Sequence, residues 1–152
     1  MPIPKQDEID MDANYKSPED AQKQGREARF RINIVSAYKY TCALTRYRLT
    51  TIAAGSIVEA AHIHAFSDSR NNDPRNGLAL CRNAHWLFDE GLWTLTDEYR
   101  VVVAVTRFSE DSPNQKALRE FHGQKILLPS DQRHWPNPIH IAWHRKNVFE
   151  AS

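Results

Sequence analysis

The chain has 152 residues and a formal net charge of +1, and hydrophobic residues make up 41% of it. This length and composition are typical of one globular domain that buries its core without disulfide bonds. The two cysteines stand apart, no apolar run is long enough to span a membrane and the N-terminus lacks a signal-peptide core, so we expect a cytoplasmic protein without membrane contact.

Charge is distributed unevenly along the chain. Residues 1–20 hold two lysines against six acidic residues, a net charge of −4, so the remaining 132 residues carry +5. The polar, aperiodic residues 1–16 predict a disordered acidic leader, and we expect residues 17–152 to form one domain. The mildly basic charge of that domain permits contact with nucleic acid without demanding it.

The first predicted helix begins at Ser17-Pro18. Serine is a favourable cap and proline suits the first helical position, while the acids that follow favour the positive end of a helix. An apolar stripe that includes Phe30 predicts that the helix continues to about Tyr40, although a glycine within it could divide it in two. A short strand or turn is expected over residues 47–51.

The middle of the chain predicts a strand, a loop, a second strand and a helix. Residues 56–64 are rich in β-branched side chains and predict a strand. Residues 66–75 include Asn-Asn-Asp-Pro, which is typical of a polar loop. Residues 78–80 predict a short second strand, and residues 82–90 a short helix that Gly91 would end.

The C-terminal part predicts a hairpin followed by helices. Residues 92–95 and 99–105 are expected to pair as strands. Helices are expected over residues 113–122 and 138–149. The predicted fold class is therefore α+β, with a small ββα core over about residues 56–91 inside a domain of flanking helices and an extra β-hairpin.

Several side chains in the middle of the chain could carry chemistry. His85 and Asp89 are four residues apart on the predicted helix, so they share one helical face and can jointly hold one metal ion. His62 lies at the end of a strand beside the loop, where a ring of near-neutral pKa can accept a proton from water. Taken alone, His62 is more often a hydrogen-bonded strand residue, and Asp89 an ordinary solvated acid.

Three motifs occur in order around these residues. They read Glu-Ala-Ala-His-Ile at residues 59–63, Asn-Gly-Leu at 76–78 and His-x-x-Phe-Asp-x-Gly-Leu at 85–92. Together they resemble the HNH endonucleases, in the subgroup found at the C-terminus of restriction enzymes, and the similarity extends over roughly residues 26–149. The resemblance implies a ββα-metal fold that hydrolyses phosphodiester bonds with one divalent ion.

The resemblance also implies roles for the motif residues. His62 would be the general base, Asn76 would brace the loop next to it, and His85 would bind the metal. Magnesium or manganese is the expected ion, and a histidine ligand also fits zinc, nickel or cobalt.

One position departs from the wider family. Many HNH enzymes place an aspartate or histidine directly before the base, where it binds the metal, and here that position is Ala61. Either another side chain supplies the missing ligand or water fills the site. Glu59 is the first candidate because it shares the strand parity of Ala61, and Asp89 is the firmer partner on the helix of His85. A His-x-His pair of His62 and His64 is conceivable, although a phosphate contact or solvent exposure suits His64 better.

Further residues are assigned outside the motifs. Arg70, Arg75 and Arg82 flank the predicted site and could hold phosphates, with plain solvation as the alternative. His144 is expected to pack rather than to react. The aromatic residues expected in the core are Trp86, Phe88, Trp93 and Trp143.

The expected function is metal-dependent cleavage of DNA, with a role in restriction or defence. The expected partners are DNA, a second copy of the chain in a homodimer, and a specificity module that is separate or fused. The main alternative is a non-catalytic nucleic-acid-binding module that keeps the HNH fold. A structural domain in a larger defence assembly is a further alternative.

Overall fold

The computed structural model describes residues 17–152, and the predicted leader over residues 1–16 lies outside the described part. Helix α2 (Pro18–Ala37) begins where the sequence predicts, because the hydroxyl of Ser17 accepts a hydrogen bond from the backbone N–H of Asp20 at 3.1 Å. The helix continues through Gly25, so the glycine does not divide it. None of the described helices combines the length and apolar character needed to cross a membrane.

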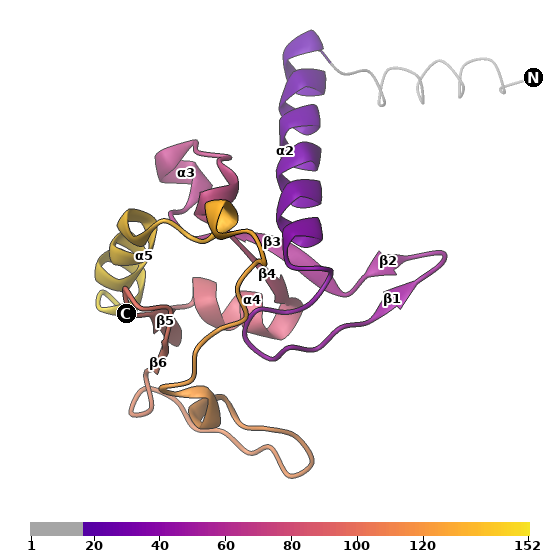
Figure 1. The fold of residues 1–152 in the computed structure, drawn as a ribbon. Coiled ribbons are helices and arrows are strands. Elements are labelled where there is room, and N and C mark those ends of the chain that lie inside the picture. The colour runs from indigo at the N-terminus through magenta and orange to yellow at the C-terminus, as the bar shows by residue number, and fades with distance from the viewer. Residues whose placement is uncertain (1–16) are drawn as a thin grey trace, which may run out of the picture.

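A ββα unit forms the centre of the fold (Figure 1). Strand β3 (Val58–His62) pairs antiparallel with β4 (Gly77–Cys81), and helix α4 (Arg82–Asp89) follows directly. Helices α2 and α4 both pack against the two strands. The predicted strand–loop–strand–helix order is confirmed, and the first strand is shorter than predicted.

Gly77 allows α2 to lie close to the sheet. A Cβ atom at this position would overlap the side chain of Ile34 and lie 3.0 Å from the ring of Phe30. Gly77 is also the register partner of His62, so the close approach of α2 occurs beside the candidate base.

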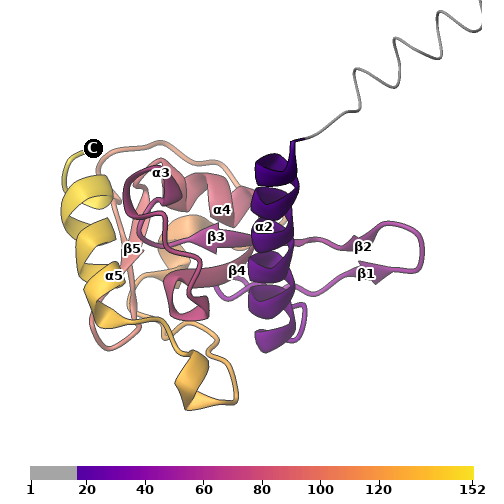
Figure 2. The same ribbon diagram turned by 90° about the horizontal axis from the view of Figure 1, so that it is seen from above.

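A second, smaller hairpin precedes the core. Strands β1 (Thr50–Thr51) and β2 (Gly55–Ser56) pair antiparallel and project away from the rest of the molecule (Figures 1 and 2). The single strand predicted over residues 56–64 is therefore divided between β2 and β3.

The loop between β3 and β4 contains two short helical turns. These are α3 (Phe66–Ser69) and the 3-10 helix η1 (Pro74–Asn76). The carboxylate of Asp73 caps η1 by accepting from the N–H of Arg75 at 2.8 Å, which is the turn chemistry expected of this polar stretch.

The predicted second hairpin is confirmed in a shorter form, as β5 (Trp93–Leu95) and β6 (Val101–Val103). The helix predicted over residues 113–122 is wrong, because only one 3-10 turn, η2 (Leu118–Phe121), forms there. Glu110 accounts for the difference: its carboxylate accepts from the N–H of Leu118 at 2.9 and 3.0 Å and holds the preceding residues as a loop.

The C-terminal helix also differs from its prediction. The 3-10 helix η3 (Gln132–His134) precedes helix α5 (Pro138–His144). Asn137 caps α5, because its side chain accepts from the N–H of Ile139 at 3.0 Å. The chain then widens into a π-helical turn, η4 (Arg145–Phe149), instead of continuing as an α-helix.

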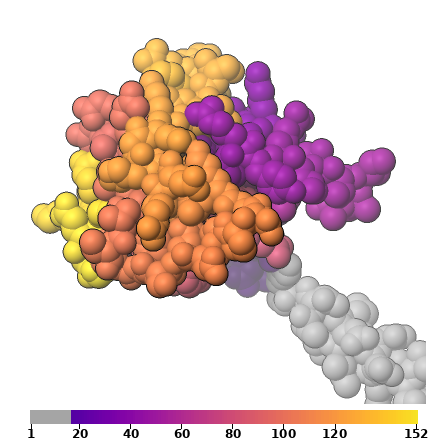
Figure 3. Space-filling view, turned by 90° about the horizontal axis from the view of Figure 1, so that it is seen from below, coloured from indigo at the N-terminus to yellow at the C-terminus, as the bar shows by residue number. Residues whose placement is uncertain are grey.

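One buried cluster joins α2, the central strands, α4 and the second hairpin. Trp93 and Phe88 are buried in it as predicted, and Trp143 is partly exposed, but the prediction for Trp86 is wrong because its side chain is 60% exposed. Trp86 directly follows His85 on α4 and points away from the core. From below, the segment after β6 (orange) covers this side and the first hairpin (purple) projects at one edge (Figure 3).

Candidate active site

His62 lies at the end of β3, and its ring is held by one stacking contact and one hydrogen bond. Its imidazole stacks on the ring of Phe30 with centroids 4.1 Å apart and planes 4° apart. Its Nε2 lies 2.9 Å from the side-chain oxygen of Asn72, in the loop before η1. Burial lowers the pKa of His62 below its usual value, against the opposing effect of the Asn72 hydrogen bond. The ring is therefore neutral at pH 7, with Nε2–H donating to Asn72 and Nδ1 left as the acceptor.

His85, on α4, lies between two carboxylates. Its Nδ1 is 2.9 Å from Oε1 of Glu59, and its Nε2 is 3.2 Å from Oδ2 of Asp89, which comes one helical turn later. Asp89 and Glu59, in that order, raise the pKa of His85 to about 9 against the effect of burial. The two acids thus favour a positive charge at this position.

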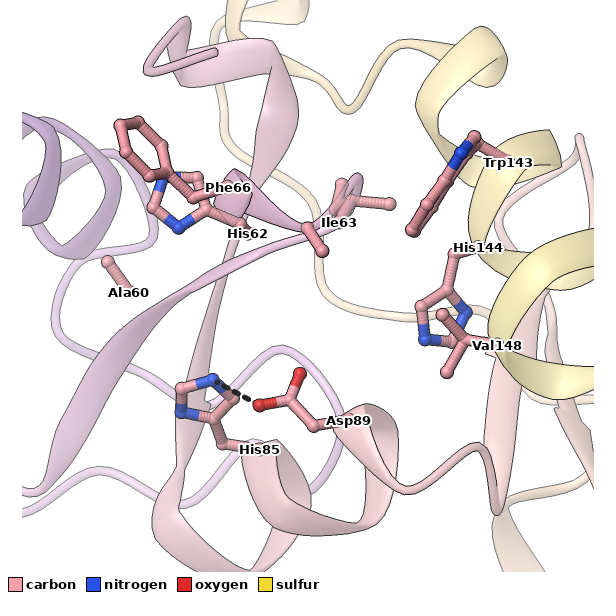
Figure 4. A pocket seen from close by; sticks show the side chains of 10 residues that line it. Ala60, His62, Ile63, Phe66, His85, Asp89, Trp143, His144 and Val148 are labelled. Carbon is pink, nitrogen blue, oxygen red and sulfur yellow. Dashed lines mark ion pairs between the residues drawn. The ribbon is translucent and has the colours of Figure 1, made fainter. Parts of the chain in front are cut away.

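His62, His85 and Asp89 line the same cavity of about 310 Å³ (Figure 4). The two rings come from β3 and α4, and one nitrogen of His62 faces the side on which His85 and Asp89 lie. Phe66 and Trp143 complete part of the wall. The structure therefore brings the predicted base and the predicted metal-binding histidine together.

Asn76 is fully buried and spans the loop that follows His62. Its Oδ1 accepts from the N–H of His64 at 2.8 Å, and its Nδ2 donates to the carbonyls of His64 at 3.1 Å and Asn71 at 3.0 Å. All the contacts of this side chain are to backbone, so it fixes the path of the chain on leaving β3.

The structure does not bring His64 to the cavity. Its Nε2 pairs with Asp68 at 2.6 Å, and its ring stacks on Trp143 with centroids 4.0 Å apart. A metal pair of His62 and His64 therefore finds no support. Glu59 contacts Nδ1 of His85, whereas Asp89 lies at Nε2 on the other edge of the ring. As long as Glu59 keeps this contact, its carboxylate cannot bind the same ion as Asp89.

The three predicted phosphate-binding arginines are exposed and make only weak or peripheral contacts. Arg82 lies 3.6 Å from Glu59, Arg75 donates to the carbonyl of Trp135 at 3.2 Å, and Arg70 sits over the ring of Phe66 at 5.5 Å. Their role in phosphate binding stays a prediction.

The donor atoms around His85 fit a divalent metal ion. With metal–ligand bonds of roughly 2.1 Å, two ligands at right angles lie about 3.0 Å apart, close to the 3.2 Å between Nε2 of His85 and Oδ2 of Asp89. Among residues 17–152 no group of three histidine, cysteine or acidic side chains could hold an ion. Two protein ligands completed by water suit magnesium or manganese.

Two contacts of His62 could not be predicted from the sequence. Asn72 lies in a stretch whose composition predicts only a loop, and Phe30 belongs to an apolar helical stripe that predicts only packing. Each acquires its contact with His62 through tertiary structure, across 10 and 32 residues of chain respectively.

Comparison with known proteins agrees with this geometry. A family model described as HNH endonuclease matches residues 42–96, which contain β3, β4, α4 and all three motifs. The solved structure of a protein titled modification dependent TagI restriction endonuclease matches with a TM-score of 0.56 and 23% identity over 80% of this chain. The chain spans 39% of that structure's length. No curated protein matches the sequence.

The fold is thus α+β with an HNH-type ββα core. Residues 42–96 are similar to the HNH endonucleases.

Proposed function

We propose that this protein is a metal-dependent HNH endonuclease that hydrolyses phosphodiester bonds in DNA. The observation that carries the proposal is the cavity shared by His62, His85 and Asp89, which combines a neutral imidazole with a metal-binding pair. Residues 17–152 would form the nuclease domain, with the ββα core at its centre.

His62 would act as the general base. Because Nε2–H donates to Asn72, the lone pair of Nδ1 is available to take a proton from the attacking water. The stack on Phe30 restricts rotation of the ring, and Asn76 fixes the backbone on the side of the loop. A lowered pKa keeps the base unprotonated at neutral pH.

His85 and Asp89 would hold the ion. When bound, a divalent metal neutralises the phosphate and stabilises the leaving oxygen. Glu59 would accept the Nδ1 hydrogen of His85, so a metal ion would replace the proton on Nε2 rather than the one on Nδ1. We expect magnesium or manganese in the cell, with zinc, nickel or cobalt as substitutes to be tested in vitro.

The replacement His62→Ala tests the proposal. We expect it to slow nicking of supercoiled plasmid with Mn²⁺ by about 10²- to 10⁴-fold, the usual contribution of a general base. Manganese affinity should stay unchanged, because His62 is not a proposed ligand. Loss of the Phe30 stack should lower the melting temperature, and far-UV circular dichroism checks that the fold is kept. The control His134→Ala changes an exposed histidine of η3 and should cut at the wild-type rate. Undiminished cutting by His62→Ala would refute the assignment.

The biological setting is also a proposal. The similar solved structure is titled as a modification-dependent restriction endonuclease, and this chain spans 39% of it. We propose that the chain supplies cleavage in restriction or defence, in the cytoplasm, and that a separate or fused module supplies specificity. Cutting both strands would suit a homodimer.

Ala61 favours one alternative, a nucleic-acid-binding module that does not cut. Its methyl group is fully buried in the core and offers no donor where many family members have a ligand. Binding of DNA without nicking in Mg²⁺, Mn²⁺, Zn²⁺, Ni²⁺ and Co²⁺ would establish this alternative.

A further inference from the structure

We propose that a groove between α2 and the β1–β2 hairpin holds the backbone of duplex DNA beside the cleaved phosphate, and that Ile52 at the hairpin tip contacts the bases. This inference rests on the proposed nuclease function and adds where the substrate lies. The surface includes Arg82, one of the three arginines that the sequence singled out, and extends to α2 and the first hairpin, which the sequence did not single out.

The groove is continuous with the candidate active site. It encloses about 730 Å³ between α2, the first hairpin, β3 and the start of α4. His62 and His85 line both this groove and the smaller cavity that contains Asp89. A polymer in the groove would therefore pass over the two histidines, as a substrate cut in its interior must do.

The segments that form the groove carry a net positive charge. Helix α2 holds four basic and three acidic residues, and residues 44–57 hold two arginines and no acid. Of the residues that line the groove, Arg31 and Arg82 are basic, and Glu27 and Glu59 are acidic. Arg31 lines the groove and forms no ion pair within the described part of the chain. Of the two acids, Glu59 is already engaged by His85 and Arg82. This surface suits a polyanion.

The hairpin presents an apolar tip to solvent. Ile52 is fully exposed, and Leu49 in the stem is exposed as well. The turn is defined by its own contacts, because the hydroxyl of Thr51 accepts from the N–H of Ala54 at 2.8 Å. Gly55 supplies the left-handed backbone that the turn requires, with φ of 80°. The side chain of Ile52 is therefore available for contact with a bound molecule.

Duplex DNA accounts for both features. Its phosphates match Arg31 and the other basic residues of α2, and a two-stranded β-ribbon fits the major groove, where an apolar side chain can contact a thymine methyl group. The projecting hairpin and the helix α2 would then lie on either side of the bound backbone (Figure 2).

Binding can be measured without cleavage in the His62→Ala protein. Fluorescence anisotropy with a labelled duplex, in Mn²⁺ and over a range of KCl concentrations, gives the affinity and its salt dependence. We expect Arg31→Gln to reduce the slope of log K against log salt by about 1, as loss of one phosphate contact does. Arg31→Lys should restore the slope, and Arg119→Gln, an exposed arginine on η2, should leave it unchanged.

Ile52→Ala should act differently. We expect the affinity for duplex DNA to fall roughly fivefold at every salt concentration, with the slope unchanged, because the lost contact is apolar. The matched control is Ile139→Ala, which removes another exposed isoleucine, from α5. All four changed residues are exposed, so the melting temperatures should equal that of the parent protein.

The outcomes separate this inference from the nuclease proposal. If wild-type protein fails to nick plasmid, the nuclease proposal fails. The binding assay still tests whether duplex DNA binds in the groove. If wild-type protein nicks plasmid but the Arg31→Gln and Ile52→Ala variants bind duplex DNA like their controls, only the proposal that DNA binds in the groove is refuted. Tighter binding of single strands than of duplex, or no binding of DNA, would also refute it.

Discussion

At the scale of single residues, Asn72 offers a direct test of how the base is oriented. Its oxygen accepts from Nε2 of His62 and favours the protonated ring, so it raises the pKa that burial lowers. We expect Asn72→Ala to lower kcat for nicking about tenfold, because the tautomer with a free Nδ1 is no longer fixed. The acid limb of the kcat–pH profile should move to lower pH, because the base then loses its proton more readily.

The control for that experiment is Asn83→Ala, which changes an exposed asparagine on α4 away from the base. Its kcat and pH profile should match those of the wild-type protein. An acid limb that moves to higher pH in Asn72→Ala would contradict the proposed hydrogen bond.

The two acids beside His85 are expected to differ in their effect on metal binding. Asp89→Ala removes a proposed ligand, and we expect Mn²⁺ affinity, measured by isothermal titration calorimetry, to fall more than about 100-fold. Glu59→Gln changes only the partner of Nδ1, so the loss should be about tenfold. Glu98→Gln, at an exposed turn, should have no effect. Equal losses for the two acids would instead make Glu59 a ligand, as strand parity predicts.

At the scale of elements, two glycines should respond to alanine in opposite ways. Gly77→Ala forces a methyl group into the buried Ile34 and Phe30, and we expect the free energy of unfolding in urea to fall by about 1–3 kcal/mol. Gly25→Ala adds a methyl group to α2 with only an arginine tip nearby, at 3.5 Å, and should raise that free energy by about 0.5–1 kcal/mol. A stabilising Gly77→Ala would show that α2 does not pack on β4 as described.

The elements that the sequence predicts well are those whose pattern is local. The strands and helix of the ββα core follow from β-branched runs, loop residues and a helix stop that are close in sequence. The helix predicted over residues 113–122 fails because the carboxylate of Glu110 competes for a backbone N–H, a contact that periodicity cannot reveal. The core prediction for Trp86 is wrong because Ala84 and Phe88 form the buried face of α4, and Trp86 lies on its exposed face.

In the candidate site, too, some contacts follow from the local sequence and others depend on tertiary packing. The pairing of His85 with Asp89 follows from helical spacing, and their meeting with His62 follows from the motif order. The orienting contacts of His62 depend on where α2 and the η1 loop pack, which the local sequence does not specify.

At the scale of the whole molecule, His144 joins three elements through one buried ring. On α5, it stacks on Phe88 of α4 with centroids 3.6 Å apart, and its Nε2–H donates to the carbonyl of Phe88 at 2.9 Å. Its Nδ1 accepts from the hydroxyl of Thr94 on β5 at 2.8 Å. The expectation that this histidine packs is confirmed, since only 2% of it is exposed.

This ring should make the stability of the protein depend on pH. Burial lowers the pKa of His144 to about 4, whereas in the unfolded chain it has the ordinary value of about 6.5. Between these values the unfolded state binds the additional proton, so acid favours unfolding. Stability from this group is complete above about pH 6.5 and is lost towards pH 4, by about 3 kcal/mol in total. Urea unfolding in EDTA at several pH values measures the loss.

The comparison that isolates His144 is His144→Gln, which cannot take up a proton at this position. We expect it to be less stable at pH 7 but to lose less stability than the wild-type protein between pH 6.5 and 5. His85 cannot imitate this behaviour, because its raised pKa of about 9 stabilises the fold at low pH and loses its effect as the pH rises through 9. Equal acid sensitivity in both proteins would show that the ring of His144 accepts a proton without breaking the junction of α4, β5 and α5.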